Sequence, residues 1–179
     1  MSDSVHAYVD ESERPGRYLM CSVVIEPARL GELRRTMRHL LLPGQSRLHF
    51  KKESVRRRRE LATALVGLGL DVSVFESRSE LGRSEAEARS LCLAAIIEDI
   101  QERGTGATLI LESRHHQDVD DHGVIDRARR SKPPLTYEHV DGDHDPLLWL
   151  PDSFAWLVGA RGDWRRRVEP TLTRYREVS

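Results

Sequence analysis

The chain has 179 residues, a length that favours one domain spanning residues 1–179. Apolar residues make up 39% and charged residues 32%, a composition that excludes a disordered chain, and no apolar run approaches the ~20 residues of a membrane-spanning helix. Two cysteines, Cys21 and Cys92, exclude a disulfide framework, and Met1 to Ser4 lack the basic-then-apolar pattern of a secretion signal. We therefore expect a cytoplasmic protein with no membrane partner.

The net charge of -1 hides an uneven distribution of charge along the chain. Residues 29–59 contain eleven Lys or Arg against two acids, whereas residues 80–126 contain eleven acids against four Arg. Such asymmetry indicates polyanion binding on one face and cation binding on another, although solvated helix faces give the same pattern.

Strands and helices alternate along the chain after an opening hairpin. The residue patterns predict strands at 6–10, 18–25, 70–75, 107–111 and 135–140, an extended piece at 48–50, and helices at 27–40, 53–69, 84–103, 118–130, 152–158 and 164–175. This order predicts an α/β fold, a mixed sheet that opens with an antiparallel hairpin and carries helices on both faces.

Three acids stand where such a sheet places its functional sites. Asp10 ends the first strand, Glu112 follows a later apolar strand, and Asp152 begins a helix near the C-terminus. If the two strands are neighbours, the carboxylates converge in one crevice, and a hard divalent ion such as Mg²⁺ or Mn²⁺ would relieve their mutual repulsion. Acids at strand ends are also common as turn formers and helix caps, so spacing alone leaves a structural role open.

Three segments carry a resemblance to a known family. They are Ala7 to Ser12 with Tyr18 to Met20, Leu48 to Glu53, and Pro146 to Trp156, which reach across nearly the whole chain. The first resembles the opening D-E-S motif of the DUF3800 family, the second is similar to a family segment with a histidine before a helix, and the third resembles the family's late aspartate motif. The family is placed among RNase H-like folds with suspected metal-dependent nuclease activity.

The resemblance implies an RNase H-like domain and a set of site residues. It assigns Asp10, Glu112 and Asp152 as catalytic metal ligands, with Glu11 as an extra ligand and His49 as a residue that positions substrate or a proton. His49 beside Phe50 equally fits a half-buried edge position. The sequence departs from the family at two points, since Glu13 replaces a glycine and Glu112 stands where Asp is commoner. Glu76 or Glu53 could therefore replace or join Glu112.

Basic residues follow the second of these segments. Lys51, Lys52, Arg56 and Arg57, with Arg58 and Arg59, could hold a phosphate backbone, or they could form a solvated helix surface. Two further clusters contain metal-ligand residue types, but neither has the spacing of a zinc or EF-hand site, and we expect solvated loops there. They are His115, His116, Asp118, Asp120, Asp121 and His122, and His139, Asp141, Asp143, His144 and Asp145.

The leading hypothesis is a divalent-metal-dependent nuclease that hydrolyses phosphodiester bonds in DNA or RNA. The alternative is a non-catalytic module on the same scaffold that binds nucleic acid or a protein, and a third reading is a metal-dependent phosphatase of small molecules. The sequence leaves open the strand type, the cleavage specificity, the pathway and whether the chain forms a homo-oligomer.

Overall fold

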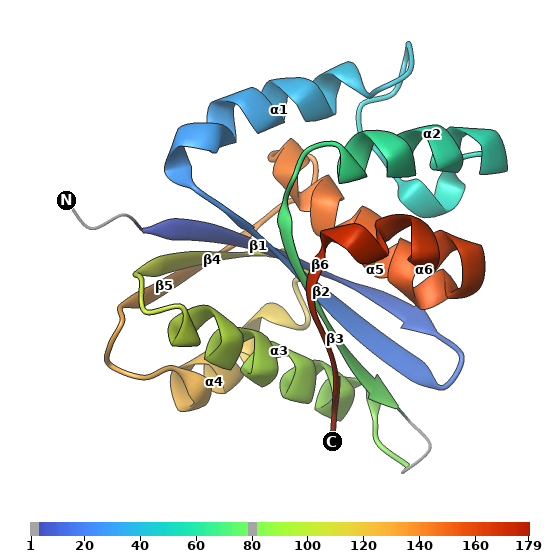
Figure 1. Ribbon diagram of the computed structural model, residues 1–179. Helices are drawn as coiled ribbons and strands as arrows, with labels where there is room; N and C mark the ends of the chain where they lie inside the picture. The colour runs from blue at the N-terminus through green and yellow to red at the C-terminus, as the bar shows by residue number, and fades with distance from the viewer. Residues whose placement is uncertain (1–3, 79–81) are drawn as a thin grey trace.

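The protein is described by a computed structural model that covers residues 4–78 and 82–179, so the pattern at Met1 to Asp3 that bears on a leader lies outside the described residues. The described residues form a six-stranded sheet with helices on both faces (Figure 1). Among them, no helix combines the length and the apolarity needed to cross a bilayer.

The strands follow the order β5-β4-β1-β2-β3-β6 across the sheet. Their bounds are β1 Val5–Arg14, β2 Arg17–Ile25, β3 Asp71–Arg78, β4 Ala107–Glu112, β5 Leu135–Val140 and β6 Leu172–Val178. β1, β2 and β3 pair antiparallel, and the pairs β1/β4, β4/β5 and β3/β6 are parallel. The predicted mixed sheet with an opening hairpin is confirmed. Its tight turn is made by Pro15 and Gly16, where Gly16 has a φ of 70° that favours glycine.

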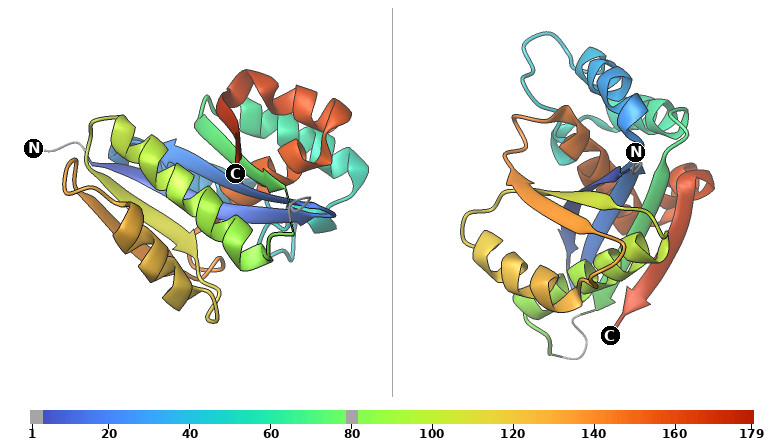
Figure 2. Two further views of the ribbon diagram at one scale, coloured as in Figure 1. Left: turned by 90° about the horizontal axis from the view of Figure 1, so that it is seen from below. Right: turned by 90° about the vertical axis from the view of Figure 1, so that its left-hand side faces the viewer.

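Two helical layers cover the sheet. One face carries α1 Leu30–His39, α2 Val55–Val66, α5 Trp149–Ala160 and α6 Gly162–Val168, and the other carries α3 Glu85–Glu102 and α4 Asp118–Ala128. Figure 2 shows α3 and α4 in front of the sheet when the molecule is seen from below. Side chains of β1 alternate between the layers, because Tyr8 packs with the α5 layer while Ala7 and Val9 pack with the α3 layer.

Local sequence signals explain where several elements begin and end. Ser84 forms a capping box with Glu87, which begins α3 one residue later, and the Ser54 side chain accepts a hydrogen bond from the Arg57 amide at the start of α2. These signals confirm two predicted helices to within a few residues.

Two predicted elements are wrong. The stretch 164–175 is not one helix: α6 ends at Val168, and β6 follows and pairs with β3. Pro170 interrupts the helix because it lacks an amide proton, and β6 shows little apolar pattern because it is a polar edge strand. The extended piece at 48–50 does not form a strand, because Phe50–Lys52 makes a 3₁₀ turn after the extended residue His49.

A buried ion network joins the α3 layer to the sheet. Arg89 of α3 is 4% exposed, and it donates to both oxygens of Asp121 at 2.8 Å and to Glu11 Oε2 at 2.9 Å. Burial alone would raise the pKa of Asp121, but the hydrogen bonds from Arg89 and His139 hold it below its usual value. Arg89 therefore balances two buried carboxylates at once.

We expect Arg89→Met to lower the free energy of unfolding by about 3–5 kcal/mol, because removing one partner leaves buried carboxylates without a counter-charge. Urea denaturation at pH 7 measures the loss. Arg127→Met on the exposed side of α4 serves as the control and should change stability by less than about 0.5 kcal/mol. A similar small change in both variants would show that the two carboxylates do not depend on Arg89.

Candidate metal centre

The parallel pairing of β1 with β4 brings two of the predicted acids together. Val9 lies opposite Leu111 in the register, so Asp10 and Glu112 are the next residues on the two neighbouring strands. Tyr8 and Ile110, two residues earlier on each strand, pack into the α5 layer. Since side chains alternate along a strand, Asp10 and Glu112 point to that same face.

Helix α5 supplies the third acid from above this face. Asp152 lies in the first turn of α5, which packs against β1 and β2, and its Oδ2 accepts a hydrogen bond from the Phe50 amide at 3.4 Å. The structure thus places the three acids that were singled out in the sequence near one another, close enough for Glu112 and Asp152 to raise the pKa of Asp10. Among the described residues, however, their ligand atoms do not all lie within 4.8 Å of one another.

The pKa values of Asp10 and Asp152 show that these two carboxyls are buried among other acids. Burial raises the pKa of Asp10 well above its usual value, and the charges of Glu11, Glu112 and Asp152 raise it further, while the Glu11 amide, which donates to Asp10 Oδ1 at 2.8 Å, opposes them. Burial also raises the pKa of Asp152 to about 6, with a contribution from Glu112. Negative charge is therefore in excess at the carboxyl ends of β1 and β4.

Two arginines compensate part of this excess. Arg47, in the segment between α1 and α2, binds the Glu112 carboxylate and lies 3.5 Å from Asp143. Arg114, just beyond β4, lies 2.8 Å from Glu11 and 4.0 Å from Asp10. Gly142 leaves room for the first pair, because a Cβ there would collide with both Glu112 and the Arg47 guanidinium.

The donor set suits a hard divalent ion. Three carboxylates offer only oxygen ligands, which Mg²⁺ and Mn²⁺ prefer, and the raised pKa values mean that a bound cation would be strongly favoured by the crowded acids. Arg47 binds Oε1 of Glu112, so a cation held by this carboxylate would lie beside the Arg47 guanidinium.

The remaining acids of the prediction are not gathered at this point. Glu11 alternates to the opposite face and pairs with Arg89, and Glu53 accepts a hydrogen bond from Gln45. Glu76 lies on β3, where Arg17 binds both of its oxygens and Tyr175 donates to it at 2.6 Å. Burial would raise the pKa of Glu76, but these hydrogen bonds hold it below its usual value.

His49 directly precedes Phe50, whose amide binds Asp152, and the predicted basic residues follow along the chain. His49 is exposed on the surface, and its partial desolvation together with the charges of Arg47 and Lys52 lowers its pKa. The side chains of Lys51, Lys52 and Arg56 are exposed, whereas Arg57 is half-buried and donates to the Leu40 carbonyl oxygen.

A second group of possible ligands lies on the α4 side of the sheet. Asp118, Asp121 and His139 have ligand atoms that all lie within 4.8 Å of one another. Their oxygens already have partners: Ser113 Oγ and the Arg114 amide donate to Asp118 at 2.7 and 2.8 Å, and Arg89 donates to both oxygens of Asp121. The two sequence clusters thus supply a bonded network here, and Asp121 is buried rather than solvated as expected.

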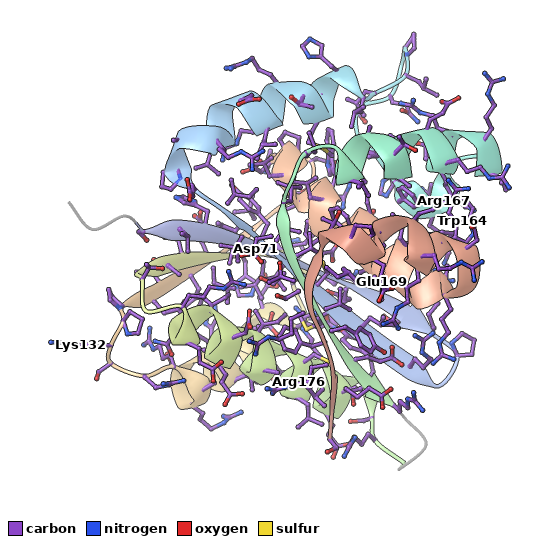
Figure 3. All side chains as sticks on the ribbon, viewed as in Figure 1. Asp71, Lys132, Trp164, Arg167, Glu169 and Arg176 are labelled. Atoms are coloured by element: carbon purple, nitrogen blue, oxygen red, sulfur yellow. The ribbon has the colours of Figure 1, made fainter. Side chains whose placement is uncertain are left out.

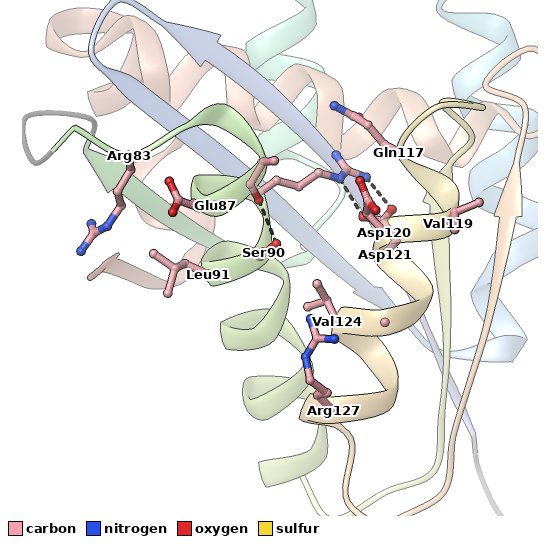
Figure 4. Close-up of a pocket in the computed structure, with 13 residues that line it drawn as sticks. Arg83, Glu87, Ser90, Leu91, Gln117, Val119, Asp120, Asp121, Val124 and Arg127 are labelled. Atoms are coloured by element: carbon pink, nitrogen blue, oxygen red, sulfur yellow. Dashed lines mark hydrogen bonds and ion pairs between the residues drawn. The ribbon is translucent and has the colours of Figure 1, made fainter.

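A groove of ≈ 630 Å³ runs between the N-terminal part of α3 and the length of α4 (Figure 4). Arg83, Leu91, Val119 and Arg127 line it, and the Arg89 pair with Asp121 lies beside it. The groove is on the opposite face of the sheet from Asp152, and so it is separate from the three crowded acids.

Comparisons with known proteins establish the fold. No family model matches the sequence, and no curated protein matches it. Among solved structures, the chain resembles RNase HII of Archaeoglobus fulgidus in its complex with PCNA (TM-score 0.60, 18% identity, 93% of this chain and 77% of that one). It also resembles ribonuclease H2 of Pyrococcus horikoshii OT3 (TM-score 0.61, 16% identity, 93% and 74%). Bst-RNase HIII in complex with Mn²⁺ is similar at TM-score 0.52, with 9% identity, 94% of this chain and 63% of that one. The fold is RNase H-like, as the resemblance implied.

We expect Mn²⁺ to raise the melting temperature at pH 7.5, and Asp10→Asn to abolish that rise, because Asp10 is the acid most crowded by the other acids. Differential scanning fluorimetry over a Mn²⁺ series measures the shift. Asp118→Asn is the matched control, since it changes one carboxylate of the second group and should leave the shift intact. If Asp118→Asn abolishes the rise and Asp10→Asn retains it, the metal site is instead at Asp118, Asp121 and His139.

The raised pKa of Asp152 predicts a pH-dependent stability in EDTA. The unfolded value is about 3.9, so the folded state holds this proton more tightly and loses stability as the pH rises from about 4 to about 6. Asp152→Asn cannot lose that proton. It should therefore match the wild type near pH 4 and exceed it by about 3 kcal/mol above pH 7. If the wild type and Asp152→Asn give parallel curves of unfolding free energy against pH, the raised pKa of Asp152 is contradicted.

Proposed function

We propose that this chain is a divalent-metal-dependent nuclease that hydrolyses phosphodiester bonds in nucleic acid. The observation that carries the proposal is the convergence of Asp10, Glu112 and Asp152, from two neighbouring strands and a helix, with the pKa values of Asp10 and Asp152 raised. The RNase H-like fold supports it as a scaffold, and the three sequence motifs support membership of the DUF3800 family, with residues 1–179 as a single domain.

In this proposal Asp10, Glu112 and Asp152 hold Mg²⁺ or Mn²⁺. A bound divalent ion would supply an activated water as the nucleophile and would stabilise charge on the leaving oxygen. The lowered pKa of His49 favours its neutral ring, which would accept or pass a proton at the edge of the site. Arg47 is free to contact a phosphate once it releases Glu112.

Cleavage assays test the proposal directly. Single- and double-stranded DNA and RNA, and an RNA/DNA hybrid, are incubated with the protein in Mg²⁺, in Mn²⁺ and in EDTA. We expect metal-dependent cleavage of at least one of these substrates, which Asp10→Asn and Asp152→Asn each reduce by more than about 100-fold. Asp118→Asn should retain activity.

A non-catalytic binding module is the second candidate, and the Arg47 and Arg114 contacts favour it, because they already compensate part of the acidic charge. If no substrate is cleaved and Mn²⁺ leaves the melting temperature unchanged, the nuclease proposal fails and the binding module stands.

A further inference from the structure

Helix α5 exposes one narrow stripe beside the acid site. Of its twelve residues, Asp152, Trp156 and Ala160 are partly exposed and the other nine are buried. These three are spaced four residues apart, so they lie on one line along the helix. Trp156 therefore stands about 6 Å from Asp152 along the helix axis.

Two guanidinium groups lie against the Trp156 indole. The Cζ atom of Arg58 is 4.4 Å and that of Arg14 is 4.9 Å from the ring centroid. The Phe50 and Trp164 rings complete the surround at 5.3 and 5.7 Å from it. The Cζ atom of Arg167 lies 6.0 Å from the centroid of the Trp164 ring, and Figure 3 labels both residues on α6.

The two arginines carry charge that no acid balances. Within residues 4–78 and 82–179, no carboxylate lies within 4.0 Å of Arg14 or Arg58, whereas the neighbouring Arg17 binds Glu76. Main-chain oxygens are their partners: Arg14 donates to Trp156 at 3.0 Å and Arg58 to Phe50 at 3.0 Å. Burial and the adjacent cations Arg17 and Arg58 lower the pKa of Arg14. An anion at this place would remove that repulsion.

The platform, meaning Trp156 with Arg14 and Arg58, is built on the same elements as the acid site, meaning Asp10, Glu112 and Asp152. Arg14 follows Asp10 by four residues on β1 and points to the same face, as Trp156 follows Asp152 on α5. Phe50 connects the two places, because its amide donates to Asp152 and its carbonyl accepts from Arg58. A polymer of phosphates that places one phosphate at the acids would therefore reach the platform with a neighbouring one.

We propose that Arg14 and Arg58, held against Trp156, bind a backbone phosphate of the nucleic-acid substrate next to the one at the acids. The identity of the polymer rests on the proposed function. Because the indole is already covered by guanidinium groups, the platform holds the backbone rather than a base. Recognition here is therefore independent of base sequence.

Fluorescence anisotropy with a labelled oligonucleotide in EDTA, repeated over a KCl series, tests this without any cleavage. We expect Arg14→Gln and Arg58→Gln each to raise Kd about 3- to 10-fold and to reduce the slope of log K against log [KCl] by about 0.7–0.9. Arg58→Lys keeps the charge and should retain the wild-type slope. Melting temperatures of every variant identify any loss that comes from unfolding.

Arg127→Gln on α4 is the matched control, since it removes the same charge from the opposite face of the sheet and should leave both quantities unchanged. Two results would overturn the platform. One is that Arg14→Gln and Arg58→Gln have the same Kd and salt slope as the wild type, and the other is that the wild type shows no salt-dependent binding. Cleavage that persists in that case leaves the nuclease proposal intact. Salt-dependent binding through Arg14 and Arg58 without cleavage would instead retain the platform and remove the nuclease.

Discussion

The alternation of side chains at the end of β1 divides two adjacent carboxylates between the two faces of the sheet. Glu11 points into the α3 layer, where Arg89 and Asp121 build a closed ion network around it. Asp10 points to the α5 layer, where further acids crowd it. A shift of β1 by one residue would exchange these environments, so the register set by β2 and β4 fixes which carboxylate enters the ion network and which joins the crowded acids.

The acid site is held by segments that are distant in sequence. Arg47 comes from the stretch between α1 and α2, and Gly142 comes from the loop after β5; together they bring the guanidinium to Glu112. This pair supplies a counter-charge for the largely buried Glu112, because a buried carboxylate without a partner is costly. In the proposed metal site, a divalent ion would meet the Glu112 carboxylate beside the Arg47 guanidinium.

The sequence predicts the features that local rules control. The capping box at Ser84, the apolar strand that ends at Glu112 and the strand at Leu135–Val140 all follow from short-range patterns. These patterns do not predict β6, because an edge strand needs little apolar surface. Pro170 was nevertheless a signal in the sequence that one helix could not cover the whole stretch 164–175. Arg47 and Arg89 were missed for another reason: their partners lie 65 and 32 residues away, and no periodicity encodes a pairing of that range.

Long-range pairing also explains why the run of arginines at the start of α2 did not reveal, from the sequence, where their charges would lie. Arg58 stood in the sequence as one of four successive arginines, yet the fold separates their roles. Arg56 pairs with Glu60, Arg57 binds the Leu40 carbonyl oxygen, and Arg58 turns onto Trp156. Arg14, far away in sequence, joins it there. Along the exposed stripe of α5 the charge thus changes from crowded acids at Asp152 to unbalanced cations at Trp156, over about one helical turn. A polyanion on this stripe would be oriented by the gradient, because its phosphates would be attracted at the Trp156 end and repelled at the Asp152 end unless a cation were bound there.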